Sequence, residues 1–370
     1  MPLPVGMQAA IFKHILSHRF RKTPRFPLVL MLEPLFGCNL ACRGCGKIQY
    51  PPEVMKRMLS PEDCWKAAAE CGAPIVAVAG GEPLIHPEIV RIVDGLIERG
   101  HYVHLCTNAL LLEKNLPKFK ARSHLIWSVH LDGAEEVHDR MVGRKGAYQT
   151  VTRAIRAAKA AGHRVMTNTT VFVGGKPEDF RAFFDECMAM GVDGMIISPG
   201  YAYDQAPAAK AIPEGRPQRS DSVLDRAPEQ GFFLTRDQTH AWFRETLRDW
   251  RSMGWDFNHS PYYLDFLEGK RDYACMPWGN PLRHVLGWQR PCYLMSEGAP
   301  AASFRDLLAT TPWERYGRAS GHPNCSQCMA HVGYEPAAVQ EGFASVGNFL
   351  KLAGEFMSVK RTPREKVGAP

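Results

Sequence analysis

Three cysteines stand close together in the stretch EPLFGCNLACRGCGK of residues 33–47. They are Cys38, Cys42 and Cys45, in the spacing C-x3-C-x2-C, with no fourth cysteine nearby in the sequence. A structural zinc site usually takes four protein ligands, supplied as two separated pairs. Three thiolates instead fit three corners of a [4Fe–4S] cube, in which the fourth iron stays open for another molecule. The spacing therefore favours an iron–sulfur cluster with one open iron over a zinc loop.

A glycine pair and a glutamate follow in the string AVAGGEPLIHP. Gly80 and Gly81 allow a close approach of the backbone, and Glu82 offers a carboxylate to a cation. A single Gly-Gly-Glu is usually no more than a turn between a strand and a helix. Its position behind an apolar strand-like run, about forty residues after the cysteines, makes it a candidate binding motif.

Small polar residues also end the later strand-like runs, in the strings LCTNALL, SVHLDG and MTNTTVF. As single residues they are typical of turns and helix caps. At successive strand ends they become candidates for binding a polar ligand, with Ser128 and Asn168 the better ones. The set consists of Thr107, Asn108, Ser128, Asp132 and Asn168.

These residues are positioned by a regular alternation of apolar runs and helical stretches. Alternation of this kind predicts an α/β fold with a parallel sheet, here a partial (β/α)6 TIM-type barrel, with its chemistry at the C-terminal ends of the strands. The predicted strands are 28–32, 75–79, 102–106, 126–131, 165–171 and 194–198. The predicted helices are 61–71, 87–99, 114–121, 147–161 and 177–190.

The cysteine spacing, placed after the first strand of such a domain, resembles the signature of the radical S-adenosylmethionine (SAM) family. The resemblance implies a barrel of the radical SAM type and a [4Fe–4S] cluster whose open iron binds SAM. One electron then cleaves SAM and releases a 5′-deoxyadenosyl radical, so SAM is a co-substrate.

The same resemblance gives roles to the other motifs. Gly80-Gly81-Glu82 would hold the methionine ammonium, and the polar strand ends would bind the ribose hydroxyls and the carboxylate. Ile197 and Pro199, in the string IISPGYAY, would line the adenine pocket. Many family members carry an aromatic residue just before the third cysteine, where this chain has Gly44. Adenine is then held in another way, or has room to move towards a substrate.

Longer strings are similar, over nearly the whole chain, to the adenosylhopane synthases, the radical SAM family of hopanoid biosynthesis. This resemblance implies addition of the 5′-deoxyadenosyl radical to the terminal alkene of hopene (diploptene). It implies a hydrophobic triterpene substrate and a one-electron reductant such as flavodoxin or ferredoxin. The strings are LVLMLEPLFGCNLACRGCGKIQYP, LCTNALLLEK, SVHLDG, GVDGMIISPGYAY, FNHSPYYLDFLEG and WGNP.

Radical addition leaves an unpaired electron, so a hydrogen atom must be supplied. Cys106 ends the third predicted strand, beside Thr107 and Asn108, and its thiol is a candidate donor. The alternative is an inert, buried small hydrophobe. A triterpene also needs a long apolar cavity, for which the C-terminal part has aromatic residues that would otherwise form core: Trp255, Phe257, Tyr262, Tyr263, Phe266, Trp278 and Trp288.

Four further cysteines form a second group, Cys275, Cys292, Cys325 and Cys328. Four thiolates can bind a closed second iron–sulfur cluster or a zinc ion, with iron–sulfur preferred. A metal-free group is the alternative. His331 is a further candidate ligand, although a core or surface position is the simpler interpretation.

Composition and charge fit a soluble globular chain. The 370 residues are 45% hydrophobic with a net charge of +7, and no window has the length of uncharged apolar sequence that a spanning helix needs. We expect a cytoplasmic protein with no nucleic-acid partner. The predicted parts are a basic amphipathic helix (1–26), the radical SAM core (27–200), a lid or insertion with a helix at 237–251 (201–254), an aromatic- and Cys-rich C-terminal domain (255–356) and a disordered tail (357–370).

Three alternatives stay open at this point. The N-terminal helix either packs on the domain or rests, as a peripheral contact, on the anionic inner surface of the membrane. The enzyme is either an adenosyl-adding enzyme or a peptide- or cofactor-modifying radical SAM enzyme with an auxiliary cluster, which abstracts hydrogen instead. The non-enzymatic alternative is an iron–sulfur electron carrier.

Overall fold

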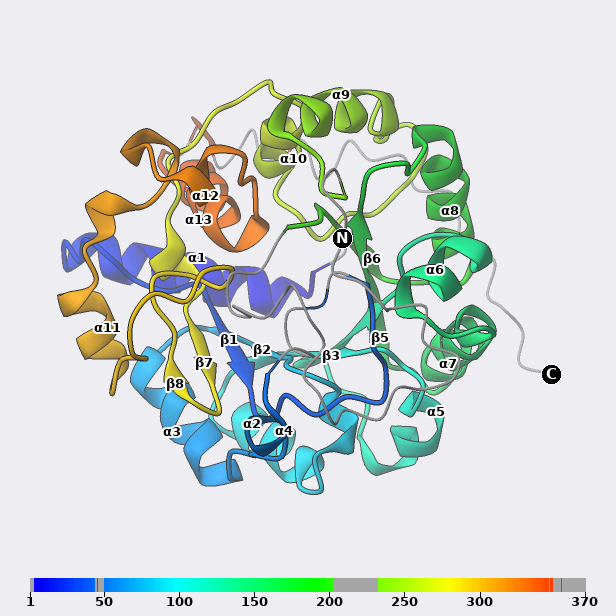
Figure 1. Cartoon of the computed structure of the whole chain (residues 1–370), viewed down its shortest axis with the longest axis horizontal. Helices are drawn as coiled ribbons and strands as arrows, with labels where there is room; N and C mark the ends of the chain where they lie inside the picture. The colour runs from blue at the N-terminus through cyan, green and yellow to red at the C-terminus, as the bar shows by residue number, and fades with distance from the viewer. Residues whose placement is uncertain are drawn as a thin grey trace.

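The centre of the molecule is one eight-stranded sheet, curved around an interior space (Figure 1). The computed structural model describes residues 3–43, 45, 50–201, 232–345, 347–348 and 354. The predictions for Gly44, for residues 202–231 of the insertion and for the tail at 357–370 lie outside these residues.

Six parallel strands form the core of the sheet, in the order β6-β5-β4-β3-β2-β1. Each begins and ends within about two residues of its predicted range, and the fold is the predicted partial barrel. The strands are β1 (Val29–Glu33), β2 (Ile75–Val78), β3 (Tyr102–Thr107), β4 (Leu125–His130), β5 (Arg164–Val171) and β6 (Gly194–Pro199).

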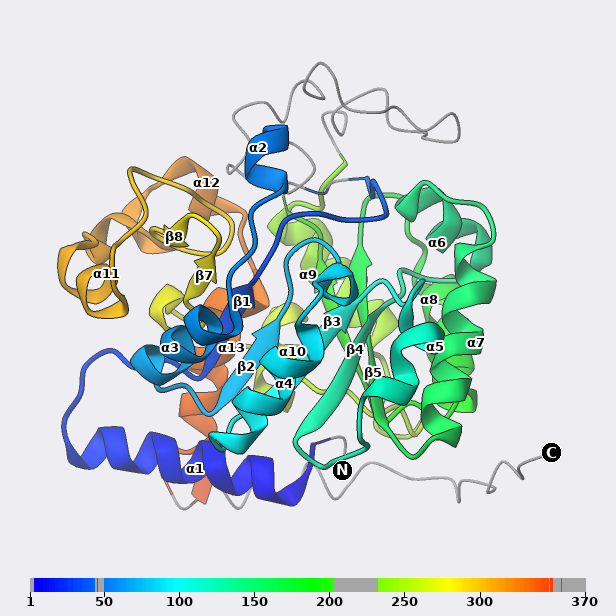
Figure 2. The same cartoon turned by 90° about the horizontal axis from the view of Figure 1, so that it is seen from below.

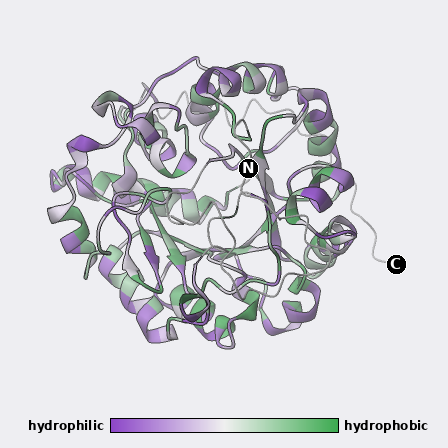
Figure 3. Ribbon diagram, viewed as in Figure 1, coloured by the Kyte–Doolittle hydropathy of each residue, from purple (hydrophilic) through white to green (hydrophobic). Residues whose placement is uncertain are grey.

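Helices cover the outer face of this sheet (Figures 1 and 2). The hydropathy colouring shows largely hydrophilic outer surfaces on them and hydrophobic colour on the strands (Figure 3). The helices are α3 (Pro61–Cys71), α4 (Ile89–Glu98), α5 (Leu112–Asn115), α6 (Glu135–Val142), α7 (Ala147–Ala160) and α8 (Pro177–Ala189).

Local sequence explains most of these boundaries. The Ser60 hydroxyl accepts a hydrogen bond from the backbone of Asp63 at the start of α3, and Gly72 ends the helix with a φ of 71°. The helix predicted at 114–121 is wrong in extent: α5 stops at Asn115 and a 3-10 turn follows, because Pro117 has no N–H to continue the helix. Helix α6 was not predicted.

The C-terminal part of the chain joins both edges of the sheet. Strand β7 (Leu282–His284) pairs in parallel with β1, and β8 (Gly287–Trp288) follows it antiparallel. At the other edge, the backbone N–H of Met195 donates to Asp256 O at 2.8 Å, and the N–H of Asn258 donates to Met195 O at 2.8 Å. This part therefore completes the barrel wall.

The remaining C-terminal helices stand beside these strands: α9 (Arg236–Thr246), α10 (Pro261–Leu267), α11 (Phe304–Thr310), α12 (Pro323–Ser326) and α13 (His331–Gly342). The helix predicted at 237–251 thus ends at Thr246. The aromatic residues that were candidates for a substrate cavity lie instead in or against the main hydrophobic core between sheet and helices, so their interpretation as core holds: Trp255, Phe257, Tyr262, Tyr263, Phe266, Trp278 and Trp288.

Helix α1 (Val5–Phe20) lies across the N-terminal ends of the strands (Figure 2). Its Met7 is buried in a cluster with Ile75 and Tyr102, which are the first residues of β2 and β3. Among the described residues, no helix is both long and apolar enough to cross a membrane.

Candidate functional site

A cavity of about 450 Å³ runs inside the barrel, parallel to the strands. At one end it is lined by Cys38, Cys42 and Cys45, and at the other by Met7 and Ile11 of α1. Ligand pockets in proteins have volumes of about 300–1,000 Å³. The cavity is thus large enough for a ligand, and it connects the cysteine loop with the opposite end of the barrel.

The alternation of side chains along each strand sets the chemistry of the cavity wall. On β3, His104 and Cys106 face the cavity, and so does Asn108 just after the strand. Polar residues gather where the strands end. Near the strand starts the wall is apolar, with Val29, Ile75, Met166 and Ile196 among the lining residues.

The three thiols of the cysteine loop influence one another. Burial raises the pKa of Cys38 to about 12. Burial also raises the pKa of Cys42 well above its usual value, and the nearby Cys45 and Cys38 add to this effect. Bound metal stabilises thiolates that protein surroundings alone would keep protonated. The donor set is thus one that suits a metal cluster.

Within the described ranges, no three His, Cys, Asp or Glu side chains are grouped closely enough to hold one metal ion. A [4Fe–4S] cube requires something different, because each cysteine thiolate binds its own iron. The loop is held from the side by Asn108, whose amide donates to Asn39 Oδ1 at 2.7 Å and approaches the Cys38 sulfur at 3.8 Å.

The glycine pair holds the cysteine loop. A Cβ at Gly81 would lie 2.0 Å from the carbonyl oxygen of Gly37, and one at Gly80 would lie 2.2 Å from Leu35 O. The Gly81 N–H donates to Leu35 O at 3.0 Å, and the Glu82 N–H donates to Gly37 O at 2.9 Å. The close approach predicted at this motif is therefore an approach of the loop backbone.

Glu82 differs from its expected orientation. Its carboxylate is buried, does not line the cavity and accepts hydrogen bonds from Thr107 Oγ1 at 2.8 Å, Asn108 N at 2.8 Å and Leu84 N at 3.0 Å. Burial raises its pKa to about 7, although the three hydrogen bonds lower it. Glu82 stands in the turn after β2, just before the short helix Pro83–Ile85. Because its carboxylate accepts from Thr107 and Asn108, it joins this turn to the end of β3.

The other predicted SAM-binding residues divide clearly. Ile197 is a correction: it is fully buried in the core, and its neighbours Ile196 and Ser198 face the cavity, since residues alternate along a strand. The remaining predicted residues meet on the cavity wall, as expected from their positions at strand ends: Thr107, Asn108, Ser128, Asp132, Asn168 and Pro199, with Gly80 and Gly81.

Asp132 has a histidine partner that the sequence did not indicate. Its Oδ2 lies 2.8 Å from Nε2 of His130, and its Oδ1 accepts from the Thr170 N–H at 2.8 Å. Burial lowers the pKa of His130, but the Asp132 carboxylate raises it more, so that it lies above its usual value.

Cys106 lines the cavity as predicted, directly opposite Ser128 in the register of β3 and β4. Burial raises the pKa of its thiol to about 12, against a hydrogen bond with the Ser128 side chain that lowers it. The sulfur therefore carries its hydrogen at neutral pH.

On the far wall, sequence reasoning missed His259 and Glu335, and it named His331 only as a candidate metal ligand or a core or surface residue. His259 Nδ1 lies 2.5 Å from Glu335 Oε2, and His331 Nδ1 lies 3.2 Å from the Ser198 hydroxyl. Burial lowers the pKa of His331 to about 3, so its ring is neutral. These residues come from distant segments and share no spacing. His104, in contrast, could have been found from strand alternation, two residues before Cys106.

The four C-terminal cysteines come together in space. Burial raises the pKa of Cys275 well above its usual value, and Cys328, Cys292 and Cys325 add to this. Burial likewise raises the pKa of Cys292 to about 12 and that of Cys328 to about 11. The Gly317 N–H donates to the Cys325 sulfur at 3.3 Å.

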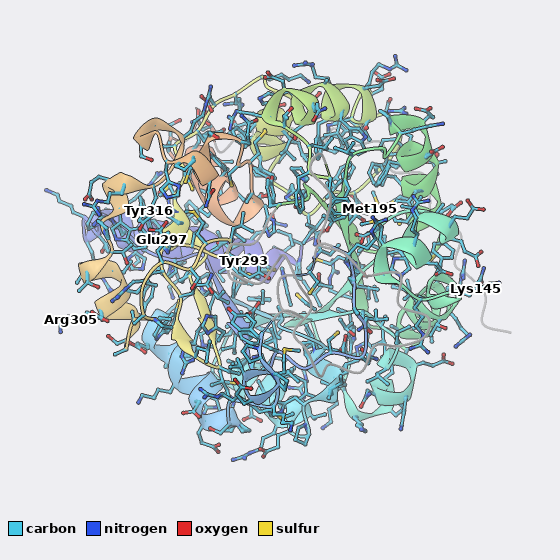
Figure 4. The ribbon with its side chains drawn as sticks, in the orientation of Figure 1. Lys145, Met195, Tyr293, Glu297, Arg305 and Tyr316 are labelled. Carbon is cyan, nitrogen blue, oxygen red and sulfur yellow. The ribbon has the colours of Figure 1, made fainter. Side chains whose placement is uncertain are left out.

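This second cysteine group borders the cavity wall. Tyr293, next to Cys292 in sequence, lines the cavity and appears near the middle of the molecule in Figure 4. Further out, the Tyr316 hydroxyl donates to Glu297 Oε2 at 2.7 Å. The group therefore lies between the cavity and the outer surface.

Two family models match the chain. Residues 32–187 match the radical SAM superfamily, and residues 220–352 match a domain of unknown function, DUF3463. The second match covers the part of the chain that holds the four C-terminal cysteines.

Curated relatives match part of the chain. The AdoMet-dependent heme synthase of Methanosarcina barkeri (strain Fusaro / DSM 804) is 31% identical over 149 residues, covering 39% of this chain and 43% of that protein. The antilisterial bacteriocin subtilosin biosynthesis protein AlbA of Bacillus subtilis (strain 168) is 30% identical, covering 40% and 34%. The GTP 3′,8-cyclase of Peptoclostridium acidaminophilum is 27% identical, covering 43% and 50%. The chain thus spans half or less of the length of these relatives, and none is an adenosylhopane synthase.

Solved structures show the same fold. Native anSMEcpe with bound AdoMet has a TM-score of 0.56 at 16% identity, covering 90% of this chain and 96% of that one. Streptococcus suis SuiB bound to its precursor peptide SuiA has a TM-score of 0.54 at 14% identity, covering 74% and 61%.

The sequence match, the shared fold and the three thiols at the end of β1 agree with one another. Residues 32–187 of this chain match the radical SAM superfamily, whose members use a [4Fe–4S] cluster and SAM.

Proposed function

We propose that the chain adds the 5′-deoxyadenosyl radical from SAM to the terminal alkene of a hopene-type triterpene such as diploptene, forming an adenosylated hopanoid. The observation that carries this proposal is the cavity. It joins the cysteine loop to a mostly apolar barrel interior that continues as far as α1, and a protonated thiol stands on its wall.

The proposed roles follow the ends of the cavity. Cys38, Cys42 and Cys45 would hold the cluster, which supplies when bound the electron that cleaves SAM. Gly80 and Gly81 fix the loop, while Ser128, Asp132 and Asn168 offer hydrogen bonds to SAM. The apolar wall near Val29 and Ile75 binds a hydrocarbon and excludes water from the reacting centre.

Cys106 would complete the reaction. The adenosyl carbon forms a bond with the terminal alkene carbon, and the unpaired electron moves to the neighbouring tertiary carbon. The Cys106 S–H bond then breaks, and its hydrogen atom goes to that carbon. The resulting thiyl radical takes one electron, from a reductant such as flavodoxin or ferredoxin, and one proton to restore the thiol.

A second candidate is a radical SAM enzyme that modifies a peptide or a cofactor by hydrogen abstraction. The relatives named above favour this class better than the hopene proposal, since they are a heme synthase, a GTP cyclase and a bacteriocin biosynthesis protein. The grouping of Cys275, Cys292, Cys325 and Cys328 also fits it, because such thiols would hold an auxiliary cluster. We propose an iron–sulfur cluster there, with zinc as the alternative.

Product analysis separates the two candidates. The chain is reconstituted anaerobically with iron and sulfide and given SAM, reductant and diploptene. The hopene proposal predicts an adenosyl adduct in the lipid fraction by mass spectrometry. Release of free 5′-deoxyadenosine with no adduct would favour hydrogen abstraction. Cys42→Ala serves as the control and should abolish turnover. An electron carrier would show a cluster spectrum that SAM does not change.

A further inference from the structure

An apolar stripe runs along the outer side of α1. The exposed fractions of Val5, Phe12, Leu16 and Phe20 are 70%, 42%, 39% and 79%. Their spacing of seven, four and four residues places them on one side of the helix. Met7 and Ile15, which anchor the helix to the barrel, are 1% exposed and lie on the other side. The helix thus carries apolar residues on two sides, one packed on the barrel and one exposed.

The stripe is not accounted for by packing within the described residues. Phe12 has a ring contact with Phe343 at 5.6 Å, and Arg19 donates to the backbone oxygen of Gln340 at 2.8 Å. These contacts fix α1 against α13 from one side. Phe20 and Val5, at the two ends of the stripe, are the most exposed of the large hydrophobic residues. Four such residues in one row form a contiguous apolar surface.

The charges on α1 itself have a single sign. Residues 1–26 contain five Lys and Arg residues and no Asp or Glu. Lys13, Arg21 and Lys22 are exposed. An exposed apolar row on a helix whose own charges are all basic can lie in the interface of an anionic bilayer. A protein partner that buried this row would have to be acidic around its edge, whereas an anionic membrane has that charge throughout.

The position of α1 relates this surface to the cavity. The inner side of the helix supplies Met7 and Ile11 to the cavity wall, and the outer side carries the stripe. The cysteine loop lies at the other end of the barrel (Figure 2). Contact at the stripe would thus leave the cluster end of the barrel in water, where the reductant can reach it.

We propose that α1 docks the chain on an anionic lipid bilayer through Val5, Phe12, Leu16 and Phe20, with the apolar end of the cavity next to the lipid. The docking itself is independent of the reaction. Its use, delivery of a membrane-dissolved substrate to the barrel beside α1, rests on the function proposed above.

The test measures flotation of the reconstituted full chain with vesicles, in two compositions. One is phosphatidylcholine alone, and the other is an equal mixture of phosphatidylcholine and phosphatidylglycerol. The stripe variant is Val5→Gln/Leu16→Gln/Phe20→Gln, which leaves Phe12 and its contact in place and keeps good helix formers in α1. The matched control is Val173→Gln/Met253→Gln, at residues that are 44% and 40% exposed outside α1.

We expect the wild-type chain and the control variant to float with the anionic vesicles, and the stripe variant to lose at least about tenfold in binding, given three apolar side chains removed from the interface. Lys13→Gln/Arg21→Gln should weaken binding about 25-fold, from about fivefold per basic residue. Cleavage of SAM by every variant shows that the barrel remains folded.

Absence of wild-type flotation with anionic vesicles would overturn the proposal, as would equal flotation of the stripe variant. Wild-type dimerisation that the stripe variant loses, without any vesicle binding, would assign the surface to a second copy and also overturn it. Vesicle binding with no adenosyl adduct leaves the docking supported and the hopene function refuted. An adduct from detergent-dispersed diploptene without vesicle binding would support the hopene function and refute the docking.

Discussion

The Cys106 thiol keeps its hydrogen because of where it stands on β3. Burial raises its pKa to about 12, so at neutral pH nearly every molecule has S–H rather than thiolate. A thiolate is a nucleophile and has no hydrogen atom to give. The same burial that makes this cysteine unreactive towards electrophiles therefore suits it to meet a carbon radical in the cavity.

Replacement of Cys106 by serine should separate SAM cleavage from product formation. The O–H bond of serine is much stronger than an S–H bond, so hydrogen transfer to the substrate radical is lost. We expect SAM cleavage to continue and the reduced adenosyl product to fall about tenfold or more, as measured by mass spectrometry.

The matched control is Cys64→Ser, a buried cysteine in α3 that does not line the cavity. It should leave the yield of reduced product unchanged. An undiminished yield in Cys106→Ser would mean that another group donates the hydrogen atom.

At the scale of single residues, the sequence predicted site residues well where their spacing along the chain was characteristic. Cys38, Cys42 and Cys45 could be predicted because they are close together in the chain. Ile197 is a core residue although Pro199, two positions further on, lines the cavity, because the regular alternation of side chains ends with β6. His259 and Glu335 could not be paired at all, because only the folded chain brings α13 to the segment before α10.

At the scale of elements, the turn after β2 and the loop after β1 form one unit. Gly81 has its Cα against the backbone of the cysteine loop, and Glu82 joins that turn to the end of β3. The motif first attracted attention as a ligand-binding candidate. In the structure its glycines have no side chain, and this lets the turn approach the backbone of the cysteine loop closely.

Gly81→Ala should therefore disturb the cluster. The added Cβ would stand 2.0 Å from Gly37 O, a backbone atom that has no rotamer by which to move away. Overpacking of this kind costs about 1–3 kcal/mol. We expect iron incorporation during anaerobic reconstitution to fall by more than half, measured by metal analysis and the visible absorption of the cluster.

Gly347→Ala is the control, because a Cβ there would lie at an ordinary contact distance of 3.7 Å from the Ser345 side chain. Its iron content should match that of the wild-type chain. Equal iron content in Gly81→Ala would show that the loop does not depend on the glycine.

The elements themselves were largely predictable. Six apolar runs separated by helical stretches gave β1 to β6, because each buried parallel strand is a short hydrophobic segment with turn residues around it. Strands β7 and β8 have only three and two residues, too few for a periodic signal. Pairing of residues 256–258 with β6 depends on distant partners and has no local pattern.

At the scale of the whole molecule, two groups of cysteines stand on different sides of one cavity. The loop after β1 supplies three thiols, and the C-terminal part supplies four, two of them in and just after α12. Thiols with pKa values raised by burial need a bound metal to exist as thiolates near neutral pH. Metal content therefore decides whether the second group is a metal site.

A wild-type chain with two [4Fe–4S] clusters would hold about eight irons, and one with a single cluster about four. The variant Cys38→Ala/Cys42→Ala/Cys45→Ala should keep about four if the C-terminal cysteines bind a cluster. Iron and zinc are measured together after reconstitution. Adding Cys292→Ala and Cys328→Ala to that variant should remove the remaining metal. Loss of all iron and zinc in the first variant would refute a C-terminal metal site.

The attachment of β7 to β1 affects how the chain is made. Met31 pairs with Leu282, so the outer side of β1 has no strand beside it until the ribosome has passed residue 282. An open strand edge can pair with other chains, and contacts between such distant segments form slowly. The barrel therefore spends most of its synthesis with one side exposed, and efficient production of the folded chain depends on shielding that edge while translation is completed.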